Sequence, residues 1–205
     1  MIKLERWSDN PVVLPSAQNL WEEKGAFNGS VIKDNNKFHM VYRALSGAQN
    51  YLGFSMQISS VGYTESEDGM HFTNHRQLIK PAEKWELFGC EDPRITKING
   101  RYFIFYTALS AYPFSPDGIK VGVAVTKNFE TIEERHLVTP FNAKAMALFP
   151  EKINGKLVGI LTANTDRPPA KIGLAFFDKE EEIWDEFFWR KWYAKLDDNV
   201  LALQK

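Results

Sequence analysis

The chain has 205 residues, 44% of them hydrophobic and 25% charged, and its formal net charge is −1. These values are ordinary for a globular protein, and the near-neutral charge gives no electrostatic basis for binding nucleic acid or an anionic membrane. No apolar run approaches the about 20 residues that a membrane-spanning helix needs.

The N-terminal segment, residues 1–11, lacks the apolar core of a signal peptide. The single cysteine, Cys90, has no partner for an internal disulfide. Because disulfides accumulate in oxidising compartments, both features favour a cytoplasmic protein. We expect Cys90 to be a small buried apolar residue. The alternative, a reactive thiol, lacks a histidine nearby in the sequence.

A hairpin pattern occurs three times along the chain, at residues 31–43, 95–107 and 150–162. Each copy places a lysine, an Asn-Asn or Asn-Gly pair, a basic residue and an apolar strand in the same order. Asn-Gly pairs supply the positive φ angles of a tight hairpin turn. The basic residues after the turns, Lys37, Arg101 and Lys156, are 64 and 55 residues apart.

A second apolar strand follows each hairpin, at residues 60–66, 120–126 and 171–177, and a turn comes after it. Each unit therefore contains about four strands. This repeat predicts an all-β protein, a β-propeller in which each unit is one blade. The alternative is an ordinary β-sandwich whose hairpins are similar by chance.

The hexapeptide at residues 89–94 places Glu91 and Asp92 next to each other, followed by Pro93 and Arg94. We expect it to form a turn that leads into the strand at residues 102–107. Neighbouring charges move the pKa values of adjacent carboxyl groups apart, which suits acid–base chemistry. The alternative is a surface salt bridge between Glu91 and Arg94, with Pro93 fixing the backbone.

Aromatic residues make up 14% of the chain, and most are expected in the core. One or two among Trp85, Phe88 and Tyr112 are candidates for a flat surface under a sugar ring. None of the four histidines has metal-ligand spacing, so no metal site is expected. The acidic run at residues 178–182 is expected to open a short C-terminal helix around Trp184.

Five segments together resemble glycoside hydrolase family 130, the family of β-mannoside phosphorylases and β-1,2-mannosidases. They are residues 27–31, 41–44, 89–95, 106–108 and 148–156. The resemblance runs in order from about Asn10 to the C-terminus. It implies a five-bladed β-propeller with the active site in the central depression, in agreement with the repeats.

The resemblance also implies roles for single residues. Asp92 matches the family's catalytic acid, which protonates the glycosidic oxygen through a sugar hydroxyl while inorganic phosphate attacks the anomeric carbon from the opposite face. Positions that match substrate-binding residues are Asn28, Gly29, Arg43 and Glu91. Positions that match basic residues at the phosphate site are Arg94, Lys152 and, in a displaced position, Arg167.

The chain departs from the family pattern at residues 161–169, where a His-Arg pair is missing. This departure bears on phosphate binding. If water attacked instead, a second carboxylate would be needed as base, and Glu151 and Asp166 are the candidates.

Length is the larger departure from the family. At about 60 residues per unit, 205 residues hold three blades and the start of a fourth, so residues 1–205 are expected to form one incomplete propeller domain. We expect a fragment or a truncated gene product; the alternatives are completion by oligomerisation and a degenerate protein. An open propeller leaves apolar faces uncovered, which favours a homo-oligomer.

Three functions follow from these observations. The first is inverting phosphorolysis of a β-linked manno-oligosaccharide or a mannosyl-glucose type substrate, with inorganic phosphate as co-substrate and no other cofactor. The second is an inverting β-mannosidase that uses water. The third is a non-catalytic carbohydrate-binding propeller that keeps a sugar pocket around Asp92.

Overall fold

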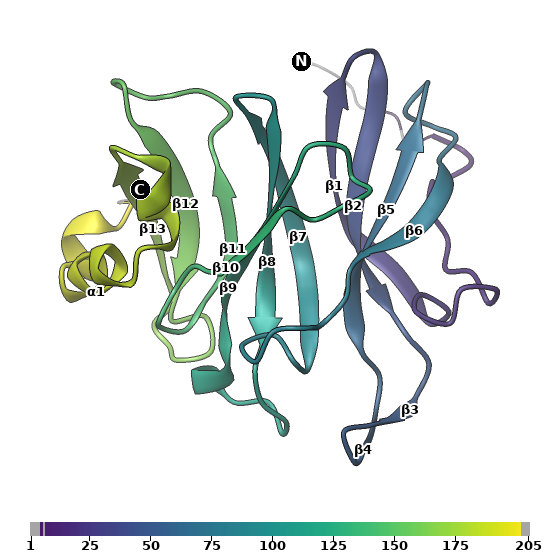
Figure 1. Ribbon diagram of the computed structural model, residues 1–205, viewed down its shortest axis with the longest axis horizontal. Helices are drawn as coiled ribbons and strands as arrows, with labels where there is room; N and C mark the ends of the chain where they lie inside the picture. Colours follow the sequence, from purple (N-terminus) through teal and green to yellow (C-terminus); the bar gives the residue numbers. More distant parts are fainter. Residues whose placement is uncertain (1–4, 6, 202–205) are drawn as a thin grey trace.

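The computed structural model describes Glu5 and residues 7–201, and most of its regular structure is β (Figure 1). The strands are β1 (Gly25–Asp34), β2 (Lys37–Leu45), β3 (Gln49–Tyr51), β4 (Phe54–Met56), β5 (Ser59–Ser66), β6 (Thr73–Ile79), β7 (Gly89–Ile98), β8 (Arg101–Leu109), β9 (Ile119–Thr126), β10 (Glu134–Leu137), β11 (Ala143–Leu148), β12 (Leu157–Ala163) and β13 (Lys171–Phe177). The helices are the α-helix α1 (Glu186–Ala194) and the 3-10 helices η1 (Pro116–Gly118), η2 (Glu180–Trp184) and η3 (Leu196–Asn199). In the described part of the chain, no helix is long and apolar enough to cross a membrane.

The strands form three consecutive antiparallel sheets, each built as an up-and-down meander. Their strand orders are β1-β2-β5-β6, β7-β8-β9-β10 and β11-β12-β13, and β3 and β4 form a separate hairpin. We call the three sheets blades 1, 2 and 3. The predicted all-β propeller architecture is confirmed for this part of the chain.

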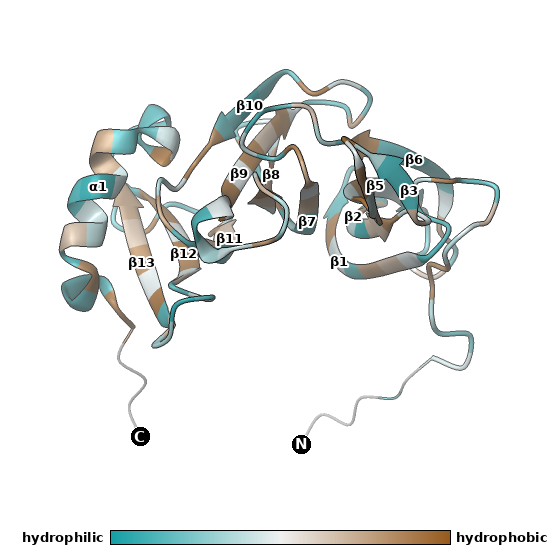
Figure 2. Ribbon diagram, turned by 90° about the horizontal axis from the view of Figure 1, so that it is seen from below, coloured by the Kyte–Doolittle hydropathy of each residue, from teal (hydrophilic) through white to brown (hydrophobic). Residues whose placement is uncertain are grey.

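The blades fan out in an arc, with β1, β7 and β11 along its inner side (Figure 2). Hydrogen bonds join these inner strands to neighbouring blades. The Ile95 amide donates to Ser30 Oγ at 3.2 Å, and Thr96 Oγ1 donates to the Leu148 carbonyl oxygen at 2.9 Å. Groups on neighbouring inner strands are thereby brought within bonding distance of each other.

The predicted hairpin turns are present in all three blades. The turn residues Asn35 and Asn36, Asn99 and Gly100, and Asn154 and Gly155 all have φ between +47° and +80°. Glycine and asparagine adopt this left-handed region at low cost, which explains why the sequence signal was reliable.

Blade 3 has three strands in the described residues rather than the four predicted. After β13 the chain enters η2 and α1, and only then does Val200 form a bridge to Gly173 on the free edge of β13. The acidic run opens a short helix around Trp184 as predicted, and this helix is the 3-10 helix η2. The α-helix α1 follows it, and Asp185 caps α1 by accepting a hydrogen bond from the Phe188 amide at 2.7 Å. Non-helical backbone at Asp185 separates the two helices.

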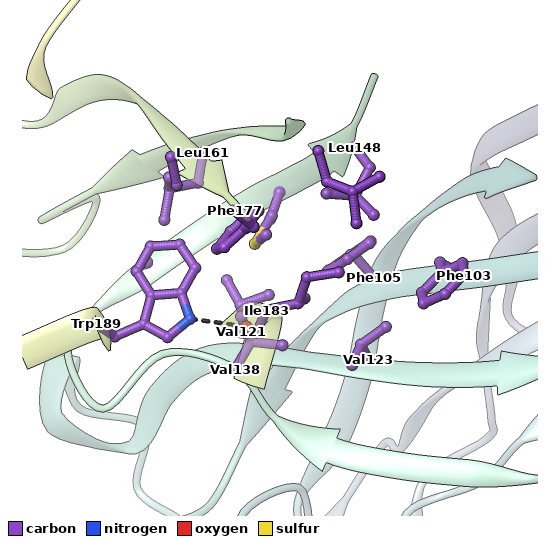
Figure 3. Packing of buried hydrophobic residues seen from close by; sticks show 14 of the residues in the cluster. Phe103, Phe105, Val121, Val123, Val138, Leu148, Leu161, Phe177, Ile183 and Trp189 are labelled. Carbon is purple, nitrogen blue, oxygen red and sulfur yellow. Dashed lines mark hydrogen bonds between the residues drawn. The ribbon is translucent and has the colours of Figure 1, made fainter. Parts of the chain in front are cut away.

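The larger core lies between blades 2 and 3 and is closed by α1 (Figure 3). Phe103, Phe105 and Phe177 are buried in it, and Trp189 of α1 packs edge-on against Phe177 at 5.7 Å. Trp189 also donates from Nε1 to the Ile183 carbonyl oxygen at 2.8 Å, which satisfies the one polar atom of its ring. The helix therefore covers one side of the blade 3 sheet.

Blades 1 and 2 each bury one glutamate against a tyrosine. Tyr42 donates to Glu22 Oε2 at 2.5 Å, and Tyr106 donates to Glu86. Each carboxylate also faces a basic group: His75 lies 3.4 Å from Glu22 and Arg135 lies 2.6 Å from Glu86. Both glutamates are fully buried, so these bonds offset the cost of their burial.

Candidate active site

Each innermost strand contains one bulge that holds a residue with positive φ. The residues are Asn28 in β1, Asp92 in β7 and Ala145 in β11, with φ of 53°, 51° and 53°. The pairing register shifts at each of them. The three residues are thus equivalent positions of the three blades.

The segment at residues 89–94 is consequently not the turn that its sequence suggested. It lies inside β7, where Glu91 pairs with Thr107 and Arg94 with Phe105, so Asp92 and Pro93 form the extra length of the bulge. A bulged residue makes no ladder hydrogen bond, so proline, which has no N–H to donate, is accepted there.

Asn28, Arg43, Ser59, Glu91 and Asp92 form one hydrogen-bonded group between blades 1 and 2, which we call the carboxylate cluster. Asn28 Nδ2 donates to Asp92 Oδ1 at 2.7 Å. Arg43 Nη2 lies 2.5 Å from Glu91 Oε1, and its Nη1 lies 3.5 Å from Asp92 Oδ1. Ser59 Oγ accepts from Arg43 Nε at 3.1 Å and donates to Glu91 Oε1 at 3.0 Å.

The two carboxylates of the cluster have different surroundings. The Glu91 side chain is 17% exposed and that of Asp92 is 32% exposed. Burial raises the pKa of Glu91, and the charge of Asp92 adds to this, while Arg43 and Ser59 act in the opposite direction. Glu91 is therefore the carboxyl group that Arg43 and Ser59 hold in place, and Asp92 is the more accessible one.

The structure brings four of the predicted substrate and catalytic residues into this cluster: Asn28, Arg43, Glu91 and Asp92. Gly29, the fifth, is exposed and follows Asn28 in the same strand. A Cβ atom at Gly29 would lie 3.1 Å from Met40 Sδ. A larger residue at this position would therefore require a small shift of the Met40 side chain.

Blade 3 contributes a charged pair, Lys144 and Asp166, of which only Asp166 was a candidate from the sequence, as a second carboxylate. Lys144 precedes the bulge of β11, and its positive charge lowers the pKa of Glu91. Lys144 Nζ lies 2.8 Å from Asp166 Oδ1, and Asn142 Nδ2 donates to Asp166 Oδ2 at 3.0 Å. Burial alone would raise the pKa of Asp166, but these two hydrogen bonds outweigh it and lower the pKa.

The three predicted phosphate-binding residues lie in different places. Arg94 lines a pocket of about 490 Å³ between β1, β7 and β11, together with Lys33 and Lys97. Lys152 is exposed after the end of β11, close to the β11–β12 turn. Arg167 is half-exposed and pairs with the exposed Asp117, outside the carboxylate cluster.

Glu151, the other candidate for a second carboxylate, is exposed near that same turn. Asp166 is held by Lys144 and Asn142, as described above. The carboxyl group next to Asp92 is instead that of Glu91. Ser59, which donates to Glu91, and Lys144, whose charge acts on Glu91, could not be found from local sequence, because they lie on other strands and, for Lys144, on another blade.

Other sequence-based expectations concern single side chains. Cys90 is fully buried in the core between blades 1 and 2, as predicted, and burial raises the pKa of its thiol. Trp85 stacks on Tyr106 and packs near Gly122, so it belongs to the interior of blade 2. The rings of Phe88 and Tyr112, whose centroids are 6.3 Å apart, stack on each other and have no ring contact with Trp85.

The cluster has the groups that an acid-catalysed glycosyl transfer requires. A carboxyl group that is accessible to a ligand can donate a proton to a leaving oxygen. The amide of Asn28 and the guanidinium of Arg43 fix its orientation and can also donate hydrogen bonds to sugar hydroxyls. Within the residues that the structure describes, no group of three or more metal-ligating side chains is present.

Comparisons with known proteins agree on one family. The model of glycoside hydrolase family 130, described as β-1,4-mannooligosaccharide phosphorylase, matches residues 9–196. A 1,2-β-oligomannan phosphorylase from Thermoanaerobacter sp. (strain X514) is 37% identical over 186 residues, which cover 90% of this chain and 60% of that protein. A β-1,2-mannobiose phosphorylase of the same strain is 32% identical, over 77% of this chain and 54% of its own length.

Solved structures agree on the fold. The β-1,2-mannobiose phosphorylase from Listeria innocua, in complex with β-1,2-mannobiose, superposes with a TM-score of 0.70 at 23% identity. The match covers 85% of this chain and 62% of that one. For comparison, the chain spans 60% and 54% of the lengths of the two Thermoanaerobacter relatives.

Proposed function

The chain belongs to glycoside hydrolase family 130, and from this premise we propose that it carries the catalytic half-site of a β-mannoside phosphorylase. The reaction is the inverting phosphorolysis of a β-linked manno-oligosaccharide to mannose 1-phosphate. The full activity is proposed for the chain together with whatever supplies the remainder of the propeller.

One observation supports this proposal above the others: the carboxylate cluster between blades 1 and 2. Asn28 and Asp92 stand at equivalent bulges and are joined at 2.7 Å, so the acid is oriented by the neighbouring blade. The two Thermoanaerobacter relatives that share this part of the chain are named 1,2-β-oligomannan phosphorylase and β-1,2-mannobiose phosphorylase. We therefore favour a β-1,2-linked substrate.

Asp92 is assigned as the general acid. Its proton passes to the glycosidic oxygen, with a hydroxyl of the sugar as relay, while the bond from that oxygen to the anomeric carbon breaks. A phosphate oxygen forms the new bond from the opposite face. The products are mannose 1-phosphate and the shortened sugar chain, and Asp92 is left as a carboxylate.

Arg43 and Asn28 are assigned to hold the mannosyl unit and Glu91 to position Arg43. The phosphate is assigned to Arg94, which lines the pocket between the inner strands. A guanidinium suits a phosphate dianion because it offers two parallel donors.

A second function, hydrolysis by water, is favoured by the positions of the predicted phosphate ligands. Arg167 pairs with Asp117, and Lys152 is exposed near a distant turn. Hydrolysis with inversion needs a second carboxylate to activate water. Glu91 is a carboxylate beside Asp92, but it is only 17% exposed and already bonded to Arg43 and Ser59, so it is poorly placed to meet a water molecule and we place this function second.

The test is to incubate the chain, together with whatever supplies the remainder of the propeller, with β-1,2-mannobiose and β-1,4-mannobiose, with and without inorganic phosphate. Mannose 1-phosphate that appears only with phosphate is the expected product. Free mannose that forms regardless of phosphate assigns hydrolysis instead. Binding of the disaccharide without any product supports the carbohydrate-binding module, the third function considered.

A further inference from the structure

Five aromatic side chains from three separate segments form a continuous group that we call the aromatic platform. Its members are Tyr51, Phe54, Phe88, Tyr112 and Phe114. The Phe54 ring lies 6.0 Å from that of Phe88 and 5.1 Å from that of Tyr112. Phe114 packs edge-on against Tyr112 at 5.3 Å.

The platform lies at the end of the blades where β7 begins. Figure 1 shows the β3–β4 hairpin, which carries Tyr51 and Phe54, extending from this same end. Phe88 precedes β7 directly, and its amide donates to the Leu109 carbonyl oxygen at 2.8 Å, so it continues the β7–β8 ladder. Glu91 follows three residues later, about 10 Å along the strand.

The platform is held in place by its own contacts. Tyr51 donates its hydroxyl hydrogen to the Leu87 carbonyl oxygen at 2.9 Å, which ties the β3–β4 hairpin to the segment before β7. The edge-to-face contacts among the rings fix their orientations and contribute stabilising free energy beyond that of the buried area. The rings are therefore arranged before any ligand arrives.

Two of the rings are nonetheless open to solvent: Phe54 is 38% exposed and Phe114 is 50% exposed. An exposed aromatic group next to a polar site is typical of a ligand surface. The ligand that suits it is a pyranose, whose C–H face packs on an aromatic ring while its hydroxyl groups stay in water.

We propose that the aromatic platform binds the sugar units of a β-linked manno-oligosaccharide that lie beyond the mannosyl unit held by the carboxylate cluster. This proposal rests on the proposed function for the class of ligand. It assigns Phe54 and Phe114 as the residues that make the chain prefer longer oligosaccharides. Sequence analysis had singled out Phe88 and Tyr112 but neither of these two.

The test measures binding, so it does not depend on turnover. β-1,2-Mannobiose and β-1,2-mannotetraose are titrated into the full chain by calorimetry without phosphate, and the recovered sugars are checked to be intact. The variants are Phe54→Ala and Phe114→Ala. The matched control is Phe187→Ala, an exposed phenylalanine on α1 that has no ring contact with the platform.

We expect the unmodified chain to bind the tetraose more tightly than the biose. Each platform variant should weaken tetraose binding about three- to tenfold and leave biose binding within about twofold, since one stacked ring contributes on this scale. Phe187→Ala should change neither. Turnover is scored separately, with phosphate added and with the remainder of the propeller present, so binding of this kind without mannose 1-phosphate refutes the proposed function and leaves the platform intact.

Three results would overturn the proposal. One is a chain that binds the tetraose no more tightly than the biose, or binds neither. Another is a pair of platform variants that lose both ligands equally. The third is a change in molar mass, measured by light scattering, on mutating Phe54 or Phe114, because the rings would then cover a protein interface.

Discussion

Asn28 and Asp92 occupy the same position of two successive blades and touch each other. They stand 64 residues apart, their φ angles are 53° and 51°, and Asn28 Nδ2 donates to Asp92 Oδ1 at 2.7 Å. The third blade has Ala145 at this position, with the same φ but no polar group. One backbone feature thus recurs, and the side chains on it have diverged.

Asp92→Asn tests the assignment of the acid. The amide cannot supply the proton, so the turnover number for β-1,2-mannobiose should fall about 100- to 10,000-fold. Binding of the disaccharide and the thermal midpoint should be retained. Asp178→Asn, an exposed residue that pairs with Lys156, is the control and should leave the rate unchanged. An Asp92→Asn chain with normal turnover would remove Asp92 from the mechanism.

The backbone at Asn28 gives a prediction of stability. Asn28→Ala keeps a Cβ atom in the left-handed region but removes the polar side chain that lets asparagine adopt it, which costs about 1 kcal/mol or more. Asn28→Gly removes the Cβ atom as well and avoids this cost. Both variants lose the hydrogen bond to Asp92. In urea unfolding, Asn28→Gly should therefore be about 1 kcal/mol more stable than Asn28→Ala, while the two should show the same loss of activity. Equal stabilities would contradict the bulge geometry.

These positions show how far the sequence alone could go. The hairpin turns were predictable because Asn and Gly are the residues that tolerate their φ values. The bulge in β7 was not, because Pro93 suggested a turn as readily as a bulge. The hydrogen bond between Ser59 and Glu91 and the effect of the Lys144 charge on Glu91 depend on how strands and blades pack, which no local pattern records.

A repeated signal was nevertheless available for the buried glutamates. The pairs Trp21-Glu22 and Trp85-Glu86 are 64 residues apart, as are Tyr42 and Tyr106. Each tyrosine donates to the glutamate of its own blade. The repeat therefore extended to these polar residues, although it was used above only for the hairpins and for the strand that follows each of them.

Arg43 and Glu91 are predicted to be energetically coupled. Removing the guanidinium by Arg43→Ala leaves Glu91, 17% exposed, with Ser59 as its remaining hydrogen-bond donor, so the free energy of unfolding should fall by about 1–3 kcal/mol. Adding Glu91→Gln should restore part of this loss. A double-mutant cycle measured by urea unfolding should give a coupling free energy of about 0.5–3 kcal/mol. Additive effects of the two mutations would show that the pair contributes nothing.

The raised pKa of Glu91 also predicts that the stability of the chain depends on pH. Its pKa in the folded chain is raised above the ordinary 4.5, mainly by burial, so the folded state holds this proton more tightly than the unfolded state does. The stabilisation is complete below the unfolded pKa and is lost as the pH rises through the folded pKa. From about pH 4 to pH 7 the unmodified chain should lose stability relative to Glu91→Gln. The opposite slope in paired urea titrations would mean that Arg43 dominates over burial.

The last prediction separates the basic residues assigned to phosphate. Arg94 lines the pocket between β1, β7 and β11, whereas Arg167 forms an exposed ion pair with Asp117. A charge-assisted hydrogen bond to phosphate contributes about 1.5–3 kcal/mol, so Arg94→Ala should raise the KM for phosphate about 10- to 100-fold. An exposed ion pair contributes little, so Arg167→Ala should change that KM by less than about threefold. Initial rates at varied phosphate and saturating β-1,2-mannobiose measure both values. The reverse order of effects would mean that Arg167 leaves Asp117 to bind phosphate and that the displaced arginine has taken over the family's missing one.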